Sequence, residues 1–265
     1  MFFLNMVMNE DLRIRIVEHA YAKKEGHIPS CFSIIDILSV LYGKFLKYNP
    51  KNPDWKERDY FILSKGHGSG ALYAILEKYG FIDPEIKAKN LEKKIFGGHP
   101  DCTKIPGVEA STGSLGHGIG IAAGIALGLK IKERKNRVIA LIGDGESNEG
   151  TVWETALVAS SQKLGNLCVI VDNNQSTKNV LPVPNMLEKW GSFGWNTYSV
   201  NGHSEEEIYG VLKKINFDYN SNPSLIVAGT IKGKGVGFME NQGSWHHRIP
   251  TEEELKKILK ELKND

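Results

Sequence analysis

Two short polar stretches, about thirty residues apart, each follow directly on an apolar run typical of a strand. Asp144 lies in a Gly-Asp-Gly turn after residues 138–142, and Asn174 ends an Asp-Asn-Asn sequence after residues 167–171. Residues 152–160 between them have helical spacing, which indicates a parallel strand–helix–strand unit. Ligands of such units lie beyond the carboxyl ends of the strands. We therefore expect the carboxylate of Asp144 and the amide oxygen of Asn174 to converge.

This pair of oxygen ligands suits a hard cation that is bound together with a phosphate. Phosphate oxygens of a cofactor can complete the coordination of Mg²⁺, with Ca²⁺ or Mn²⁺ as alternatives. Gly143 and Gly145 allow the backbone to approach those phosphates, and the amides that open the next helix favour anions. Because the chain has no GxxxxGK[ST] sequence, the stretch predicts a diphosphate–metal site without a P-loop. The alternative is a pair of ordinary turns.

Five of the histidine segments form a second group of candidate functional residues, because four of them are flanked by glycine, which leaves a ring room to face a ligand. A single histidine of this kind is more often exposed or satisfied within the core, but five such segments favour a shared ligand. Zinc is disfavoured, since no His-x-x-x-His pair shares a helix. The segments are Gly26-His27, Gly66-His67-Gly68, Gly98-His99-Pro100, Gly116-His117-Gly118 and Trp245-His246-His247.

The Gly-Asp-Gly start and the terminal asparagine resemble the thiamine diphosphate (ThDP) motif, and the flanking residues 143–154 resemble the transketolase family in particular. The resemblance extends along nearly the whole chain. Residues 64–70 are similar to the S-x-G-H-G segment of the family, which implies that His67 contacts the cofactor diphosphate. Residues 112–116 resemble TGPLG, which implies that Gly113, Ser114 and Leu115 line the cofactor ring.

The same resemblance implies catalytic and metal-binding roles. His27 matches the early family histidine near the substrate, His99 matches the Gly-His-Pro histidine that faces the donor hydroxyls, and His246 matches the KGKG…WHG ending. These three would position and polarise donor oxygens, and His246 would also contact the diphosphate. The remaining implied ligands are Asp144, Asn174 and the backbone carbonyl of Ser176 for the metal, with Gly145 and Asn174 on the cofactor phosphates.

The sequence departs from the family pattern at four places. His117 stands where glutamine is usual, His247 where glycine is usual and Ser176 where an apolar residue is usual, and Ile28-Pro29 reverses the usual order after the first histidine. We expect these departures to lie near the substrate rather than the metal. They therefore leave the identity of the sugar more open than that of the cofactor.

The chain resembles only the first of the three domains of a full transketolase. The glutamate that protonates the aminopyrimidine of the cofactor lies in the second domain of the family, and Glu149 resembles an interface glutamate instead. The resemblance thus implies the N-terminal subunit of a split transketolase. It would be active only with a C-terminal partner that carries the pyrimidine-binding and C-terminal domains, in an α2β2 heterotetramer that acts on sugar substrates.

Three alternatives remain open. The Gly-Asp-Gly-x-x-Asn-Glu-Gly sequence also resembles the α subunit of 2-oxo acid dehydrogenases, although the Gly-His segments and the KGKG…WH ending argue against it. A transketolase-like enzyme that acts on an unusual sugar in carbohydrate biosynthesis would explain the four departures. A non-catalytic binding module is the third, and the intact Asp144, Asn174, His67 and His246 argue against it.

Composition sets the class of protein around these motifs. The 33 Lys and Arg nearly balance the 31 Asp and Glu of the 265 residues, which gives no electrostatic reason to expect nucleic acid or an anionic membrane. The three cysteines are far apart in the sequence and match no disulfide or zinc pattern. With no secretion signal and no apolar run of membrane-spanning length, we expect a cytoplasmic protein.

Strands and helices alternate along the chain, which predicts a doubly wound parallel α/β sheet flanked by helices. The resemblance implies the ThDP-binding fold, as one diphosphate-binding domain over residues 1–265 with a helical N-terminal extension of about 1–55. Further strands are expected at 60–63, 195–200 and 225–231. Three glycines four apart, Gly120, Gly124 and Gly128, predict a smooth helix face on which another helix can pack tightly, either within the chain or across a subunit interface. Capping pairs are expected at Ser33 with Asp36, Ser204 with Glu207 and Thr251 with Glu254.

Overall fold

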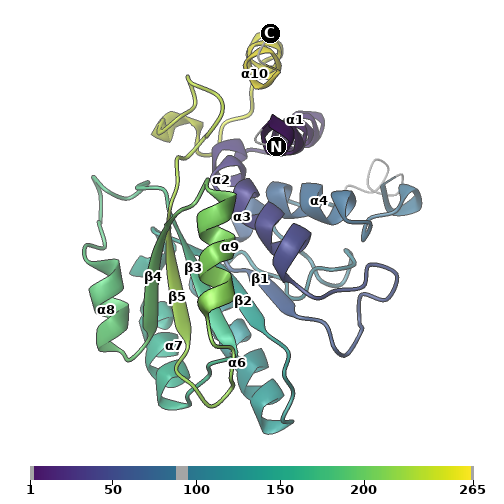
Figure 1. Ribbon diagram of the computed structural model, residues 1–265. Coiled ribbons are helices and arrows are strands. Elements are labelled where there is room, and N and C mark those ends of the chain that lie inside the picture. Colours follow the sequence, from purple (N-terminus) through teal and green to yellow (C-terminus); the bar gives the residue numbers. More distant parts are fainter. Residues whose placement is uncertain (1–2, 88–94, 264–265) are drawn as a thin grey trace.

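A five-stranded parallel sheet forms the centre of the computed structural model, which describes residues 3–87 and 95–263 and the side chains from residue 9 onward. The strand order is β1-β2-β3-β5-β4 (Figure 1). Every pair of neighbouring strands is parallel. The strands are β1 (Tyr60–Leu63), β2 (Val138–Gly143), β3 (Leu167–Asn173), β4 (Asn196–Asn201) and β5 (Ser224–Gly229).

Helices cover both faces of the sheet, as expected for a doubly wound fold (Figure 1). Along β2, Val138 and Ala140 pack into one apolar cluster while Ile139 and Leu141 pack into the other. This alternation follows from the period of two along a strand. The first cluster is shared with α6 (His117–Ile131), α7 (Gly150–Ser161) and α8 (Met186–Ser192), and the second with α3 (Ile35–Val40), α4 (Ser69–Lys78) and α9 (Glu205–Lys214).

The segment before β1 is helical and contributes buried side chains to the second cluster. It comprises α1 (Phe3–Lys23), α2 (Ile28–Phe32), α3 and a π-helical turn, η1 (Leu41–Phe45). Pro29 lies in the first turn of α2, where a missing N–H costs nothing. The last helix, α10 (Glu252–Leu262), lies against α1, so that the first and last helices of the described residues are neighbours (Figure 1).

Two of the three expected helix caps are confirmed. Ser204 accepts the Glu207 N–H at the start of α9, and Thr251 forms a reciprocal capping box with Glu254 at the start of α10. The Ser33 cap is wrong, because α3 begins after Ile34 and has no side-chain cap. Tertiary contacts take up the two expected side chains instead: the Ser33 hydroxyl donates to Asp172 (2.7 Å), and the Asp36 carboxylate binds Arg13 (2.7 Å).

The glycines of α6 do not pack closely against another helix of this chain. A Cβ added at Gly124 or Gly128 would meet nothing within 4 Å, and one at Gly120 would reach only the Thr155 hydroxyl at 3.6 Å. The expected close contact is therefore absent from the described residues. The face is open to a second polypeptide.

The carboxyl ends of the strands bring the candidate site residues to one edge of the sheet. Gly143 pairs with Asp172, and Asn173 pairs with Gly229, so β2, β3 and β5 end level with one another. Short 3₁₀ turns follow β1 at η2 (Gly66–Gly68) and β2 at η3 (Glu146–Asn148). The predicted motifs at residues 64–70 and 143–145 lie at these turns.

Candidate active site

Asp144, Asn174 and Ser176 meet at the ends of β2 and β3. The Asp144 Oδ1 atom accepts hydrogen bonds from the Gly145 N–H (2.8 Å) and the Ser176 hydroxyl (2.9 Å). The Asn174 Oδ1 atom accepts the Ser176 N–H (3.1 Å). The convergence expected from the strand–helix–strand unit is therefore present. We expected the backbone carbonyl of Ser176 at the metal and its substituted side chain near the substrate. The side chain also lies at the metal position, since its hydroxyl donates to Asp144.

A buried carboxylate that we did not predict, Asp172, holds this corner together. It is fully buried, and its Oδ2 atom accepts from Lys65 Nζ (2.5 Å), the Ser33 hydroxyl (2.7 Å) and Asn174 Nδ2 (2.8 Å). Thr230 donates to its other oxygen. Burial alone would raise the pKa of Asp172, but the Lys65 charge and these hydrogen bonds hold it below its ordinary value. Asp172 thereby joins the ends of β1, β3 and β5 to α2.

A second buried carboxylate, Glu146, joins the ends of β1 and β2 to the start of α6. Its carboxylate accepts from the Ser64 hydroxyl (2.5 Å) and from the backbone N–H groups of Gly116 (2.9 Å) and Gly143 (3.1 Å). Burial raises the pKa of Glu146, and the hydrogen bonds offset part of that increase. Gly116 has a φ of 80° at the N-cap of α6, and a Cβ there would lie 2.3 Å from the Thr151 hydroxyl. Only glycine suits this turn. The turn fixes the position of the preceding residues Gly113, Ser114 and Leu115.

Four histidines form a cluster above the sheet edge. The ring centroid of His27 lies 5.4 Å from that of His67, 5.2 Å from that of His246 and 4.6 Å from that of His247. His67 and His246 are 5.6 Å apart. Gly26 makes this approach possible, because a Cβ there would lie 2.7 Å from the His247 backbone. Segments from the start, middle and end of the chain thus meet at one place.

Three rings of the histidine cluster, those of His27, His67 and His246, are held in the neutral state. Burial, followed by the neighbouring cationic groups, lowers the pKa of His27 and of His246 to about 4 and that of His67 to about 2. Lys232 Nζ lies 2.9 Å from His246 Nδ1, and burial lowers the pKa of Lys232 as well. A neutral ring that accepts from Lys232 at Nδ1 carries its proton on Nε2. His246 can therefore donate that proton's hydrogen bond to a ligand.

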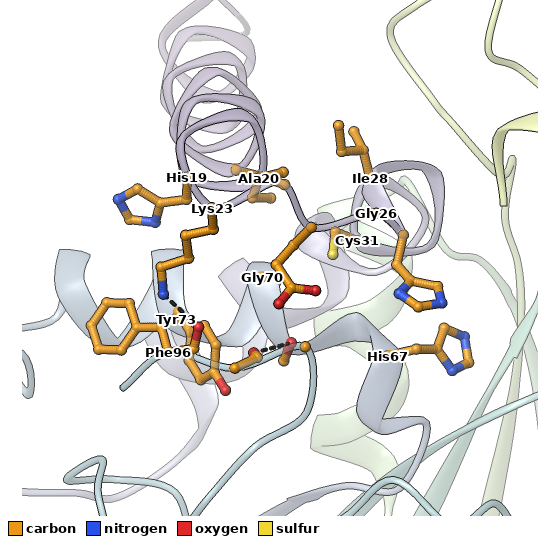
Figure 2. A pocket seen from close by; sticks show the side chains of 16 residues that line it. His19, Ala20, Lys23, Gly26, Ile28, Cys31, His67, Gly70, Tyr73 and Phe96 are labelled. Carbon is orange, nitrogen blue, oxygen red and sulfur yellow. Dashed lines mark hydrogen bonds between the residues drawn. The ribbon is translucent and has the colours of Figure 1, made fainter. Parts of the chain in front are cut away.

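His99 reaches the site from a different loop. Its ring is exposed and lies against Gly66 and Gly113, where an added Cβ would come within 3.0 Å of its Cδ2 atom. The Tyr73 hydroxyl donates to the His99 carbonyl (2.8 Å). Figure 2 shows a cavity that Gly97 and Gly98 of this loop help to line, with His67 at one end and Lys23, Tyr73 and Phe96 at the other. Lys23 Nζ donates to the Phe96 carbonyl (2.5 Å), which fixes the other end of the loop.

His117 stays outside the histidine cluster. It is exposed at the start of α6, where its Nδ1 atom lies 3.2 Å from the Ser114 hydroxyl and 3.1 Å from the Leu115 carbonyl. It therefore borders the segment that we expect to line the cofactor ring. Of the five Gly-His and Trp-His segments, four contribute rings to the site and this one flanks it.

The donor set fits a hard cation with a diphosphate. Asp144, the Asn174 amide oxygen and the Ser176 carbonyl are oxygen donors of the kind that Mg²⁺ prefers. Gly145 has no room for a side chain, since a Cβ would lie 2.9 Å from Thr177 Cγ2, and a surface cleft begins at Asp144 and runs past Asn173 and residues 177–178. Among the described residues, no group of three or more His, Cys, Asp or Glu side chains is arranged to hold a metal. The candidate metal site accordingly contains a single carboxylate.

Sequence reasoning missed the charged residues beneath the site. Lys65, Asp172 and Lys232 lie within or beside the predicted motifs, and Glu146 lies two residues after Asp144. Their signal was a charged residue in or directly after an apolar strand, where burial requires a partner. The partners are distant in sequence, so the pairing itself could not be read from the chain.

The fold and the site define a ThDP-binding α/β domain, and comparison with known proteins identifies its family. The chain matches the family model "Transketolase, thiamine diphosphate binding domain" over residues 5–265. It therefore belongs to the transketolase family, in which it corresponds to the N-terminal, ThDP-binding part. This match places it with the transketolases rather than with the 2-oxo acid dehydrogenase α subunits.

Curated relatives of two lengths resemble this chain. One of the subunits of the apulose-4-phosphate transketolase of Phocaeicola vulgatus is 36% identical over 262 residues, which cover 97% of this chain and 92% of that protein. The 6-deoxy-6-sulfo-D-fructose transketolase subunit SqwG of Clostridium sp. is 36% identical over 246 residues, with 91% and 89% coverage. Human transketolase is 35% identical over 262 residues, which cover 95% of this chain but only 41% of that protein.

Solved structures agree with this division. Transketolase from Leishmania mexicana superposes with a TM-score of 0.86 at 26% identity, and covers 96% of this chain with 40% of its own. Transketolase from Campylobacter jejuni gives a TM-score of 0.85 at 31% identity, with 97% and 42% coverage. The chain thus spans nearly the whole length of the subunit relatives and about two fifths of the full-length enzymes.

Proposed function

We propose that this chain binds ThDP and a divalent metal as the N-terminal subunit of a two-chain transketolase. Together with its partner it transfers a two-carbon ketol unit from a ketose, or its phosphate, to an aldose. The observation that supports this most directly is the meeting of the Asp144–Asn174–Ser176 corner with the histidine cluster at one edge of the sheet. When bound there, ThDP supplies the nucleophilic carbon and the electron sink for the carbon–carbon bond.

In this proposal the metal and the cofactor diphosphate share the sheet edge. Asp144, the amide oxygen of Asn174 and the backbone carbonyl of Ser176 hold Mg²⁺, or Ca²⁺ or Mn²⁺ in its place. Gly145 lies against the phosphates, and His67 donates to them. The neutral state of His67 suits this role, because a neutral ring leaves the charge balance to the metal and to Lys232.

The histidines above the diphosphate position the sugar. His27 and His246 lie 5.2 Å apart, and His99 faces Gly113 across the loop that we propose lines the cofactor ring with Ser114 and Leu115. Their N–H groups can hold donor hydroxyl and carbonyl oxygens in one orientation, which is the main contribution that positioned groups make to such a reaction. A non-catalytic binding module would not require this arrangement.

We propose that the partner supplies the pyrimidine-binding and C-terminal domains, in an α2β2 heterotetramer. The names of the shorter relatives support a partner, since both describe one subunit of a transketolase. Large apolar side chains exposed on this chain also support one, because apolar surface that a folded chain leaves exposed is often covered by a partner. They are Leu157 and Val158 on α7, Ile121 and Ile131 on α6, and Val180 and Leu181 in the loop after β3.

A modified sugar is the second candidate substrate. Two of the shorter relatives are named for apulose-4-phosphate and 6-deoxy-6-sulfo-D-fructose. His247 lies 4.6 Å from His27 in the cluster, so this departure from the family pattern faces the substrate side. We propose that His247 influences the choice of sugar.

We also propose a cytoplasmic location. The three cysteines, Cys31, Cys102 and Cys168, are all free thiols. The helices of the described residues are all too short or too polar to cross a bilayer. The thiols support the proposal, because a reducing compartment keeps them so.

Ligand-dependent melting of the two-chain complex tests the cofactor and metal assignment. A ligand that binds only the folded state raises the melting temperature. We expect ThDP and Mg²⁺ to raise it together, and each alone to raise it much less. In the Asp144→Ala variant the joint effect should be lost. Asp218→Ala is the control, since this exposed carboxylate precedes β5, at the opposite end of the strand. Equal shifts in both variants would refute the metal site.

A further inference from the structure

The 231–234 segment after β5 is held by earlier parts of the chain at three backbone atoms, and the Lys232 carbonyl also accepts the Asn241 N–H (2.8 Å) from the loop that follows. The Ile231 N–H donates to His203 Nε2 (2.8 Å), the Gly233 N–H donates to the Pro29 carbonyl (3.1 Å), and the Lys234 carbonyl accepts from Arg13 Nε (3.0 Å). Lys232 lies between these points and reaches His246. The location of the Lys232 ammonium group therefore depends on how firmly the three backbone atoms are held.

Two of these three hydrogen bonds, those made by His203 and Arg13, belong to one buried polar network. The Asp36 Oδ2 atom accepts from His203 Nδ1 (2.7 Å) and from Arg13 Nη2 (2.7 Å), and Asn9 and Arg13 donate to Oδ1 (2.8 and 3.2 Å). Arg13 and Asp36 are buried, and the His203 side chain is 12% exposed. In a buried network a lost partner is costly, because the remaining groups stay unsatisfied. The network joins α1, α3 and the β4–α9 turn to the 231–234 segment.

The hydrogen bonds of His203 allow one protonation state. Its Nε2 atom accepts from a backbone N–H and so carries no proton, which places the proton on Nδ1 facing Asp36. The ring is thus a neutral bridge between a carboxylate and a backbone amide. A side chain that lacks either function breaks the connection.

We propose that His203, held by Asp36 and Arg13, is a positioning residue that fixes the 231–234 segment and thereby sets Lys232 against His246. The significance of this for catalysis rests on the proposed function, in which His246 contacts both cofactor and substrate. None of the three residues touches the metal corner or the histidine cluster. Their effect on the site is carried through the backbone of residues 231–234.

Substitutions at His203 separate positioning from packing. His203→Phe keeps the bulk of the ring but removes both hydrogen bonds, whereas the amide of His203→Gln can donate to Asp36 and accept from Ile231. Ser204→Ala is the control, because it removes the α9 cap next to His203 without any contact to the 231–234 segment. Arg13→Lys, which keeps a charge near Asp36 but loses the bond to the Lys234 carbonyl, is a second test that does not alter His203.

The first readout is the NMR titration of the His246 ring in the full chain, which requires neither partner nor cofactor. In the wild-type protein the pKa of His246 is expected at about 4. His203→Phe and Arg13→Lys should raise it toward the ordinary value of about 6.5, because Lys232 moves away. His203→Gln and Ser204→Ala should leave it unchanged. Equal behaviour of the Phe and Gln variants, or an equal shift in Ser204→Ala, would overturn the proposal.

The second readout uses the two-chain complex. We expect His203→Phe to raise the KM for ThDP on the order of tenfold, the size of effect that loss of a supporting hydrogen bond has behind metal ligands, and His203→Gln to restore it. If the wild-type complex does not bind ThDP, the proposed function fails while the His246 titration still tests the positioning. If the wild type binds and all variants match it, the positioning fails and the function stands.

Discussion

At the residue scale, the site depends on side chains whose charge is determined by their surroundings. Asp172 and Lys65 are 0% and 1% exposed and neutralise each other below the metal corner. The Asp172 carboxylate also orients the Asn174 amide, since it accepts from Nδ2 and leaves Oδ1 directed toward Ser176 and Asp144. The metal-binding geometry that we propose thus rests on a carboxylate that does not bind the metal.

Removal of the charge at Asp172 is expected to destabilise the fold. Asp172→Asn leaves Lys65 buried without a counter-ion, and breaking a buried pair in this way costs about 3–5 kcal/mol of the free energy of unfolding. Urea denaturation of the chain measures the change. Asp101→Asn, which removes an exposed ion pair with Lys104, is the control and should be close to neutral. A similar small effect in both variants would show that the buried pair is not needed.

Acid is expected to destabilise the protein through the histidine cluster. The folded-state pKa of His27 and His246 is about 4, below the unfolded value of about 6.5. Between these values the unfolded chain binds more protons, so stability falls as the pH drops from about 6.5 to about 4. The melting temperature should decline over this window, and less steeply in His27→Asn. A decline of equal slope in the variant would contradict this explanation.

At the element scale, sequence patterns predicted the strands and helices but not all of their ends. The candidate strand 60–63 coincides with β1, and 138–142 and 167–171 fall short of β2 and β3 by one and two residues. The extra residues are polar or glycine, which an apolar pattern does not include. The helical extension expected over about 1–55 begins with α1, Phe3–Lys23. The pair Ser33 and Asp36 has the spacing of a cap, and only the fold shows that both side chains have buried partners elsewhere.

The sequence predicts which residues form the candidate site but not how all of them are held in place. The motifs supplied the residues that converge, and the topology of parallel strands explains why Asp144 and Asn174 meet. The supporting residues Asp172, Glu146 and His203 could not be found in this way. Glu146 binds Ser64, 82 positions away, Asp172 binds Ser33, 139 positions away, and His203 binds Asp36, 167 positions away. No local pattern records such pairs.

The turn that opens α6 is expected to tolerate no side chain at Gly116. Gly116→Ala places a Cβ against the Thr151 hydroxyl in a backbone conformation that costs about 1–2 kcal/mol for an L-residue. The Gly113–Leu115 segment should shift, and ThDP affinity of the complex, measured by calorimetry, should fall. Gly210→Ala is the matched control, because an added Cβ meets nothing within 4 Å in the middle of α9. Unchanged affinity in Gly116→Ala would show that this segment does not line the cofactor.

At the scale of the whole molecule, the chain corresponds to one domain of a larger enzyme. It spans 92% of one subunit relative but 41% of human transketolase. Its site lies at the carboxyl ends of the strands, and α6 and α7 carry large exposed apolar side chains, among them Ile121, Leu157 and Val158. Exposed apolar side chains of this kind are where we expect the missing domains to bind.

The most direct measurement is two-carbon transfer by the chain alone, by a partner that carries the pyrimidine-binding and C-terminal domains alone, and by the two together, each with ThDP and Mg²⁺. We predict turnover only in the mixture, with a fixed ratio of the two chains in the active complex, and none when Asp144→Ala replaces the wild-type chain. Full transfer by the chain alone would contradict the assignment of this protein as one half of a split transketolase.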